Sequence, residues 1–514
     1  MNRFVTLLIL MLLRIGQVEA MGADPAATTA RIDSALADHW NQLAVEPSVL
    51  VDDAGFLRRA SLDLIGRVPA VSELREFLED GREDKRRRLV QKLLRTPSYR
   101  RTMAQFWRRS WFPQTDNAPY TKLADSFESW LTSRLAEGRP YNSIVYELVT
   151  VAPGELAVTS GKTRAHDLTP LTFLDANDRS PELLAGNTTR AFLGLNLDCA
   201  QCHNHPFAEW TQREFWQMAA FFTPVEGTPV RFETVLPETR TTIAAQFLKS
   251  DLVEWPETRT PETGRILLAK WITSRDNSYF SRNVVNRVWA QFLGAGLIEP
   301  LDDLSRPDAS PHAQLLAELA DAFAGSEFNL DALIEAIVLT RAYQQSSETV
   351  RGSASDSVAS DAFARGGVRG LNGEQLYDSL LVAAGLPLDR IDLGPEQRTR
   401  GREEFVKQFR IGRPMAAERS ILQALTLMNG PLTRTVASAD ECPTIVATAK
   451  SPFLTPSQKI ETVFLAVLSR RPDESESPVF VEYFQRTSDR SSPEHALANI
   501  FWALVNSSEF NTNH

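Results

Sequence analysis

Apolar residues recur at helical spacing along most of this chain, and this periodicity limits its fold more than any other feature. In the N-terminal half the stripes hold large side chains, namely Tyr99, Met103, Phe106, Trp107 and Trp111, followed by Leu123, Phe127, Trp130, Leu131 and Leu135. Such stripes are typical of helix faces packed in a core, and this favours a core role over a cofactor pocket. The sequence therefore predicts a mostly α fold.

Helical periodicity stops near residue 225 and returns after residue 265. Helices are predicted near 311–324, 329–343, 373–384, 417–428, 457–469 and 494–508. Between the two helical regions, prolines interrupt short pieces of β character, such as 230–235. We therefore predict two helical domains, 30–225 and 265–512, joined by a Pro-rich connection over 226–264 with little β structure.

The N-terminus has the pattern of a signal peptide over residues 1–20. Arg3 precedes an apolar run over 4–13, and Val18-Glu19-Ala20 fits a cleavage site with small residues. No later stretch reaches 18 uninterrupted apolar residues, so we expect no transmembrane segment in the mature chain. The predicted location is the periplasm or the cell surface, with Met21 as the first mature residue.

Charge narrows the range of partners. The formal net charge of −10 argues against general nucleic-acid binding. Residues 82–109 are nevertheless strongly basic, with Glu83 and Asp84 as their only acidic residues. Such a stretch is typical of the solvated faces of two helices, and the alternative is a docking patch for an acidic protein partner.

One short motif carries recognisable chemistry. The chain has three cysteines, too few for a disulfide-built scaffold, and two of them lie in Cys199-Ala200-Gln201-Cys202-His203. This spacing is the attachment signature of c-type haem, in which both thiols form thioethers and the histidine binds the iron. Because c-type haem is made outside the cytoplasm, the signal peptide and the motif agree. We predict haem c on Cys199 and Cys202, with His203 as iron ligand.

Two other interpretations of the motif stay open. Cys199, Cys202 and His205 have the spacing of zinc or iron ligands, with His166, His312 or an aspartate as a fourth, and this would suit a metal-dependent enzyme. Alternatively, the two cysteines form a structural disulfide in a non-catalytic surface or scaffold protein. No sixth iron ligand stands out, because Met218 lies on a helical pattern typical of core packing. Without another catalytic motif, the sequence leaves open whether the chain is an enzyme.

Longer blocks around these residues resemble a known family. The blocks 192–194, 199–207, 210–212 and 219–222 resemble the cytochrome-c-like PSCyt domain of planctomycete proteins, and Arg58-Arg59-Ala60-Ser61-Leu62-Asp63-Leu64-Ile65-Gly66 is similar to its N-terminal signature. In the second half, the blocks 286–289, 302–303, 311–312, 340–343 and 506–510 resemble the companion planctomycete domain of unknown function. The family's cytochrome-like label rests on the same Cys-x-x-Cys-His spacing. The motif and the N-terminal pattern together predict an exported redox or electron-transfer protein with an unknown redox partner.

Overall fold

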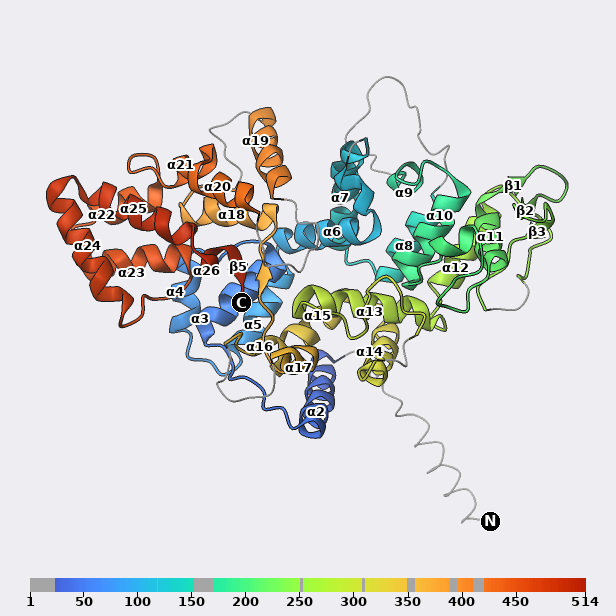
Figure 1. Cartoon of the computed structure of the whole chain (residues 1–514), viewed down its shortest axis with the longest axis horizontal. Coiled ribbons are helices and arrows are strands. Elements are labelled where there is room, and N and C mark those ends of the chain that lie inside the picture. The colour runs from blue at the N-terminus through green and yellow to red at the C-terminus, as the bar shows by residue number, and fades with distance from the viewer. Residues whose placement is uncertain are drawn as a thin grey trace, which may run out of the picture. The chain divides into compact units, whose positions relative to one another are not determined.

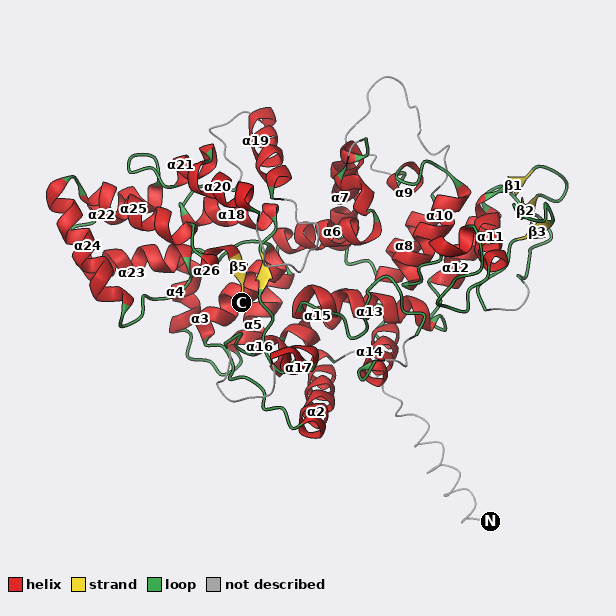
Figure 2. Cartoon of the chain, viewed as in Figure 1, coloured by secondary structure: helices red, strands yellow, loops and turns green. Residues whose placement is uncertain are grey.

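A computed structural model describes residues 24–117, 119–151, 170–249, 253–306, 310–348, 356–388, 395–409 and 420–514. The predicted signal peptide lies outside these residues. The described chain is mostly helical, as the periodicity predicts (Figures 1 and 2).

The first elements run in chain order to the end of the Pro-rich connection. The helices are α2 (Pro25–Leu43), α3 (Asp53–Ile65), α4 (Val71–Glu79), α5 (Lys85–Leu94), α6 (Pro97–Trp111), η1 (Pro113–Asp116), α7 (Thr121–Ala136), α8 (Tyr141–Thr150), α9 (Thr172–Asp175), α10 (Pro181–Thr188), η2 (Thr189–Leu193), η3 (Asp198–Gln201), α11 (Gln212–Ala219) and η4 (Ala220–Phe222). The strands β1 (Pro224–Val225), β2 (Arg231–Val235) and β3 (Thr242–Ala244) follow.

The remaining elements confirm the helices predicted after residue 265. They are α12 (Thr263–Ile272), α13 (Ser278–Leu293), α14 (Ala313–Gly325), α15 (Leu330–Val338), α16 (Arg341–Gln344), α17 (Asp356–Asp361), β4 (Arg369–Gly370), α18 (Gly373–Ala383), α19 (Pro395–Gln408), α20 (Ile421–Asn429), α21 (Pro431–Val436), α22 (Pro443–Lys450), α23 (Pro456–Val467), α24 (Glu476–Arg490), α25 (Pro493–Val505), α26 (Ser508–Asn511) and β5 (Thr512–Asn513).

The β structure is small, as the sequence predicts. Within the described residues, β1, β2 and β3 form an antiparallel sheet in that order, with Pro224 opposite Phe232 and Thr234 opposite Ile243. The piece of β character near 230–235 therefore belongs to a three-stranded sheet. A second antiparallel pair joins β4 to β5 at the C-terminus, with Arg369 opposite Asn513.

The chain forms two compact units that do not follow chain order. The first compact unit comprises the described parts of 1–35, 103–291 and 295–337, and the second comprises 36–102, 292–294 and 338–514. Each unit therefore takes residues from both sides of the 226–264 connection.

Aromatic side chains form much of the core of the first compact unit. The Trp107 ring centroid lies 5.4 Å from that of Trp111 and 4.8 Å from that of Tyr141. Phe127 and Trp130, from the second predicted stripe, are also buried. The core interpretation of the two stripes is confirmed, since large buried rings contribute most of the apolar area that such a core removes from water.

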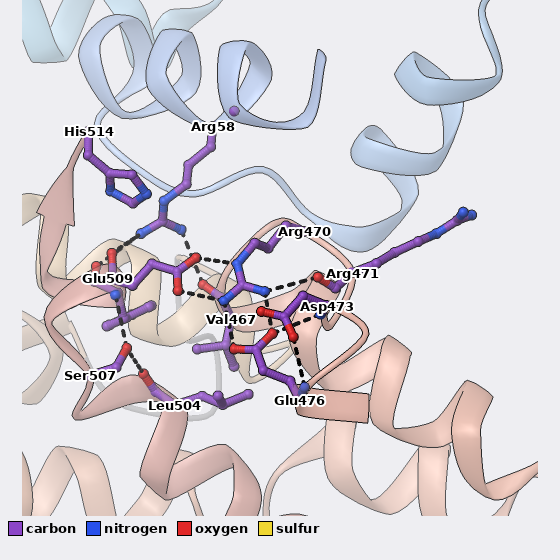
Figure 3. Close-up of polar contacts among 12 residues, drawn as sticks. Arg58, Val467, Arg470, Arg471, Asp473, Glu476, Leu504, Ser507, Glu509 and His514 are labelled. Atoms are coloured by element: carbon purple, nitrogen blue, oxygen red, sulfur yellow. Dashed lines mark hydrogen bonds and ion pairs between the residues drawn. The ribbon is translucent and has the colours of Figure 1, made fainter. Parts of the chain in front are cut away.

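Arg58 holds the ends of two helices in the second compact unit (Figure 3). Its guanidinium donates to the carbonyl oxygen of Val467 at 3.2 Å and to those of Glu509 and Phe510 at 3.1 and 3.0 Å. Val467 ends α23, where carbonyl groups lack partners within the helix, so a cation is favourable there. Burial lowers the pKa of Arg58 to about 10, which still leaves it charged at neutral pH.

Asp63 is hydrogen-bonded to side chains from three segments of the second compact unit that are far apart in the sequence. Its carboxylate is 1% exposed and accepts hydrogen bonds from the Tyr343 hydroxyl at 2.8 Å, Arg369 Nη2 at 2.7 Å and Asn513 Nδ2 at 2.8 Å. Burial, followed by the nearby Asp63 charge, raises the pKa of Tyr343 well above its ordinary value, so its hydroxyl remains a donor. The charged residues of the 58–66 signature therefore hold this unit together.

Candidate functional site

A π-helical turn leads the chain into the cysteine motif. The turn η2 releases backbone carbonyl groups, and α13 supplies the side chains that satisfy them. Arg287 Nη2 donates to the carbonyl oxygen of Arg190 at 3.0 Å, and Asn283 Nδ2 donates to that of Ala191 at 2.8 Å. The turn ends at Gly194, whose φ of 66° favours glycine and where a Cβ would lie 2.9 Å from Asn283 Oδ1.

Asp302 completes the support of this turn. Its carboxylate lies 2.5 Å from Arg287 Nη2 and 3.6 Å from Arg190 Nη1. Burial lowers the pKa of Arg190, and the Asp302 carboxylate opposes that effect. Arg287 and Asp302, which the sequence marks as motif residues without a role, therefore position the segment that precedes the cysteines.

The loop over 198–205, called the motif loop, is held by its backbone while its thiols face solvent. Cys199 and Cys202 are exposed, and both are free thiols. Trp216 Nε1 donates to the carbonyl oxygen of Gln201 at 3.0 Å, and Gln212 Nε2 donates to that of Cys202 at 2.8 Å. Both donors lie on one face of α11, since residues four apart share a helix face. The structure thus presents both cysteines outward from an anchored loop.

His203 keeps one ring nitrogen free of hydrogen bonds to the described residues. Its ring is exposed, and Nδ1 lies 2.7 Å from the carbonyl oxygen of Asn204. Because a carbonyl oxygen only accepts, the proton is on Nδ1 and the lone pair of Nε2 is free. Ligating histidines commonly donate their other N–H to a backbone carbonyl in this way. Asn204 is itself fixed, since its Oδ1 accepts from the backbone N–H of Gln212 at 3.0 Å.

His205 has the opposite hydrogen-bonding pattern, because its Nδ1 is an acceptor. Its Nδ1 accepts hydrogen bonds from the backbone N–H groups of Phe207 at 3.2 Å and Ala208 at 3.0 Å. The ring proton is therefore on Nε2, and neither nitrogen offers a free lone pair. Within the described residues, no group of three or more His, Cys, Asp or Glu side chains is placed to hold a metal ion. The structure does not assemble Cys199, Cys202 and His205 as a metal site.

The other residues considered from the sequence lie away from this arrangement. Met218 is fully buried, in agreement with the core interpretation. His312 is buried at the start of α14, and His166 lies outside the described residues. The third cysteine, Cys442, is buried in the second compact unit, where burial raises the pKa of its thiol to about 11. The motif loop thus holds two exposed thiols, Cys199 and Cys202, and the free imidazole nitrogen of His203.

The basic stretch 82–109 consists mostly of α5 and α6, as its two-helix interpretation predicts. Several of its charges pair within the protein. Arg86 Nε donates to Asp53 Oδ1 at 2.9 Å, and Arg108 is buried with carboxylate oxygens of Glu128 and Asp116 at 2.6 and 2.7 Å. Much of the stretch therefore stabilises the fold.

Two family models match the chain, in the order that the sequence blocks predict. PSCyt2, described as a protein of unknown function (DUF1549), matches residues 31–227, and PSD1, described as a protein of unknown function (DUF1553), matches residues 264–413. No curated protein and no solved structure matches the chain. In the part that the structure describes, no helix has the length and apolar character needed to span a bilayer.

Proposed function

We propose that this chain, which combines a PSCyt2 domain with a PSD1 domain, is an exported redox protein that carries c-type haem. Cys199 and Cys202 would hold the haem by thioether bonds, and His203 would bind the iron. When bound, haem supplies a centre that accepts and releases one electron at a time. The observation that carries the proposal is the hydrogen bond from His203 Nδ1 to the Asn204 carbonyl oxygen, because it leaves Nε2 free.

The chain's own residues prepare the motif loop for attachment. Gln212 and Trp216 fix the carbonyl groups of Cys202 and Gln201, so the loop keeps its shape while both thiols stay accessible. Asn204 orients the His203 ring and, as the acceptor of the Nδ1 proton, makes Nε2 a better donor to a metal. The roles of these three residues were not predicted from the sequence. The signal for Gln212 and Trp216 there is an amide and an indole four residues apart, just after the motif.

Covalent attachment tests the proposal directly. The full chain, made with its N-terminal segment in a host that matures c-type cytochromes, should be red and keep its haem through denaturation and acid–acetone extraction. Cys199→Ala or Cys202→Ala should remove one thioether bond and lower haem retention severalfold, and the double variant should retain none. Absorbance of the extracted protein measures the retained haem.

Cys442→Ala is the matched control, because it removes a cysteine from the other compact unit. It should leave haem retention unchanged. Colourless protein with about one metal ion per chain would replace haem with the metal-site interpretation. Colourless, metal-free protein with Cys199 joined to Cys202 would leave the scaffold interpretation.

Export is a separate part of the proposal. The apolar run over 4–13 and the small residue Ala20 predict cleavage before Met21. N-terminal sequencing of the protein from its native envelope fraction should therefore begin at Met21 or within a few residues of it. A full-length chain that begins at Met1 and remains in the cytoplasmic fraction would contradict export, and with it the route to haem attachment.

A further inference from the structure

A cavity of about 380 Å³ lies among α3, α4 and α5. Its volume is in the range of about 300–1,000 Å³ that small-molecule sites occupy. Every residue that lines it belongs to the second compact unit, whereas the motif loop belongs to the first. The cavity is thus a separate feature from the proposed haem site.

The floor of the cavity is apolar. Leu57 from α3, Phe77 from α4 and Leu93 from α5 line it, and their exposed fractions are 2, 7 and 6%. The helix α3 packs against both α4 and α5 (Figure 1). A hydrocarbon body is favoured on this floor, because burying it removes apolar surface from water.

One small polar residue also lines the cavity. Ser61 lies on α3 and is 1% exposed. A larger side chain at this position would therefore occupy part of the cavity.

The rim carries charges of both signs, and most acidic groups are already occupied. Both carboxylate oxygens of Glu73 accept from Arg67, at 2.8 and 3.0 Å, and both oxygens of Asp80 accept from Arg82. Lys85 lies 2.5 Å from Asp53. These groups have little capacity left for a ligand.

Two basic side chains of the rim keep free donors. Arg88 uses only Nε, toward the Asp84 carboxylate, and its terminal nitrogens have no partner among the described residues. Lys92 lies 3.5 Å from Glu76 in a pair whose side chains are 64% and 73% exposed, so that pair is weak. Because α5 contains basic residues and no acidic one, the potential along this wall favours an anion.

We propose that the cavity binds an amphipathic anion, with its alkyl chain on the Leu57, Phe77 and Leu93 floor and its head group at Arg88 and Lys92. An arginine with two free terminal nitrogens suits a carboxylate or phosphate, because it can donate two parallel hydrogen bonds. The same chemistry occurs in a free fatty acid and in an acidic lipid head group. On the opposite wall, exposed Glu79 makes a cationic amphiphile the competing ligand class.

The test is calorimetric titration of the full chain with laurate, with dodecylammonium as the cationic counterpart. Laurate should bind at one saturable site, and dodecylammonium more weakly. Arg88→Ala should weaken laurate binding by at least about tenfold, because it removes the charge-assisted hydrogen bonds that Arg88 would donate to the carboxylate. Arg87→Ala is the matched control, because Arg87 neighbours Arg88 and does not line the cavity. It should leave the affinity unchanged.

A second variant separates loss of binding from loss of fold. Ser61→Leu places apolar volume inside the cavity and should abolish laurate binding, with the helical circular dichroism unchanged. Phosphatidylglycerol vesicles that compete with laurate would identify a lipid head group as the source, and vesicles without effect would identify a free amphiphile. Absence of saturable laurate binding, equal effects of Arg87→Ala and Arg88→Ala, or tighter binding of dodecylammonium would overturn the proposal.

Discussion

Asp63→Ala is expected to destabilise the second compact unit by about 3–5 kcal/mol, the usual cost of removing one partner of a buried ion pair. The change leaves the buried Arg369 guanidinium without its carboxylate and removes the acceptor of Tyr343 and Asn513. Hydrogen–deuterium exchange should therefore speed up in peptides that cover α3, β4 and β5. Peptides from the first compact unit serve as an internal reference.

Asp84→Ala is the control for this prediction. Asp84 pairs with Arg88 at 2.8 Å, but both side chains are more than half exposed, so about 0.5 kcal/mol or less should be lost. The double variant Asp63→Leu, Arg369→Met should recover much of the stability, because it removes both charges and fills the space with apolar atoms. Equal exchange in Asp63→Ala and Asp84→Ala would contradict the role of Asp63.

The elements that the sequence predicted well are those with an uninterrupted apolar stripe. The predicted helices 311–324 and 373–384 match α14 and α18 within one or two residues. Periodicity works there because each helix buries one face in a core. The helix α24, Glu476–Arg490, was not predicted, and within it only Phe484 is buried, while Phe480, Val481 and Tyr483 are partly buried against the core.

The assignment of chain segments to the two compact units could not be predicted from such patterns. It depends on long-range contacts, such as that of Asp63 with Asn513, and no local signal encodes them. Arg58 and Arg59 were noticed only as part of a family signature. A pair of arginines in an apolar helix has no evident partner in the sequence, because its partners are backbone carbonyls of distant segments, including Val467 and Tyr343.

The candidate site was located from sequence, but the roles of its two histidines were not decided. Residue spacing identified Cys199, Cys202 and His203 as the candidate haem site. The same kind of spacing allowed His205 to be a ligand in the alternative metal site. What distinguishes the histidines is the neighbour of each Nδ1 atom, a carbonyl oxygen for His203 and backbone N–H groups for His205. Such neighbours follow from the course of the loop, which residue spacing alone does not specify.

In the haem-loaded protein, His203→Ala should therefore change the visible spectrum far more than His205→Ala does. His203→Ala removes the proposed iron ligand, so the visible spectrum should change strongly and added imidazole should restore it. His205→Ala removes only the acceptor of two backbone hydrogen bonds in the loop, so its spectrum should stay close to that of the unchanged protein. A metal site built from Cys199, Cys202 and His205 predicts instead that His205→Ala lowers the metal content more than His203→Ala does.

The same contrast can be measured before haem is attached. Nitrogen-15 NMR of the haem-free protein should find the ring proton of His203 on Nδ1 and that of His205 on Nε2, because their neighbours are an acceptor and two donors respectively. Asn204→Ala should loosen the His203 arrangement through loss of the bond to the Gln212 N–H. His203 with its proton on Nε2 would remove the free lone pair on which the haem proposal rests, whatever the colour of the purified protein.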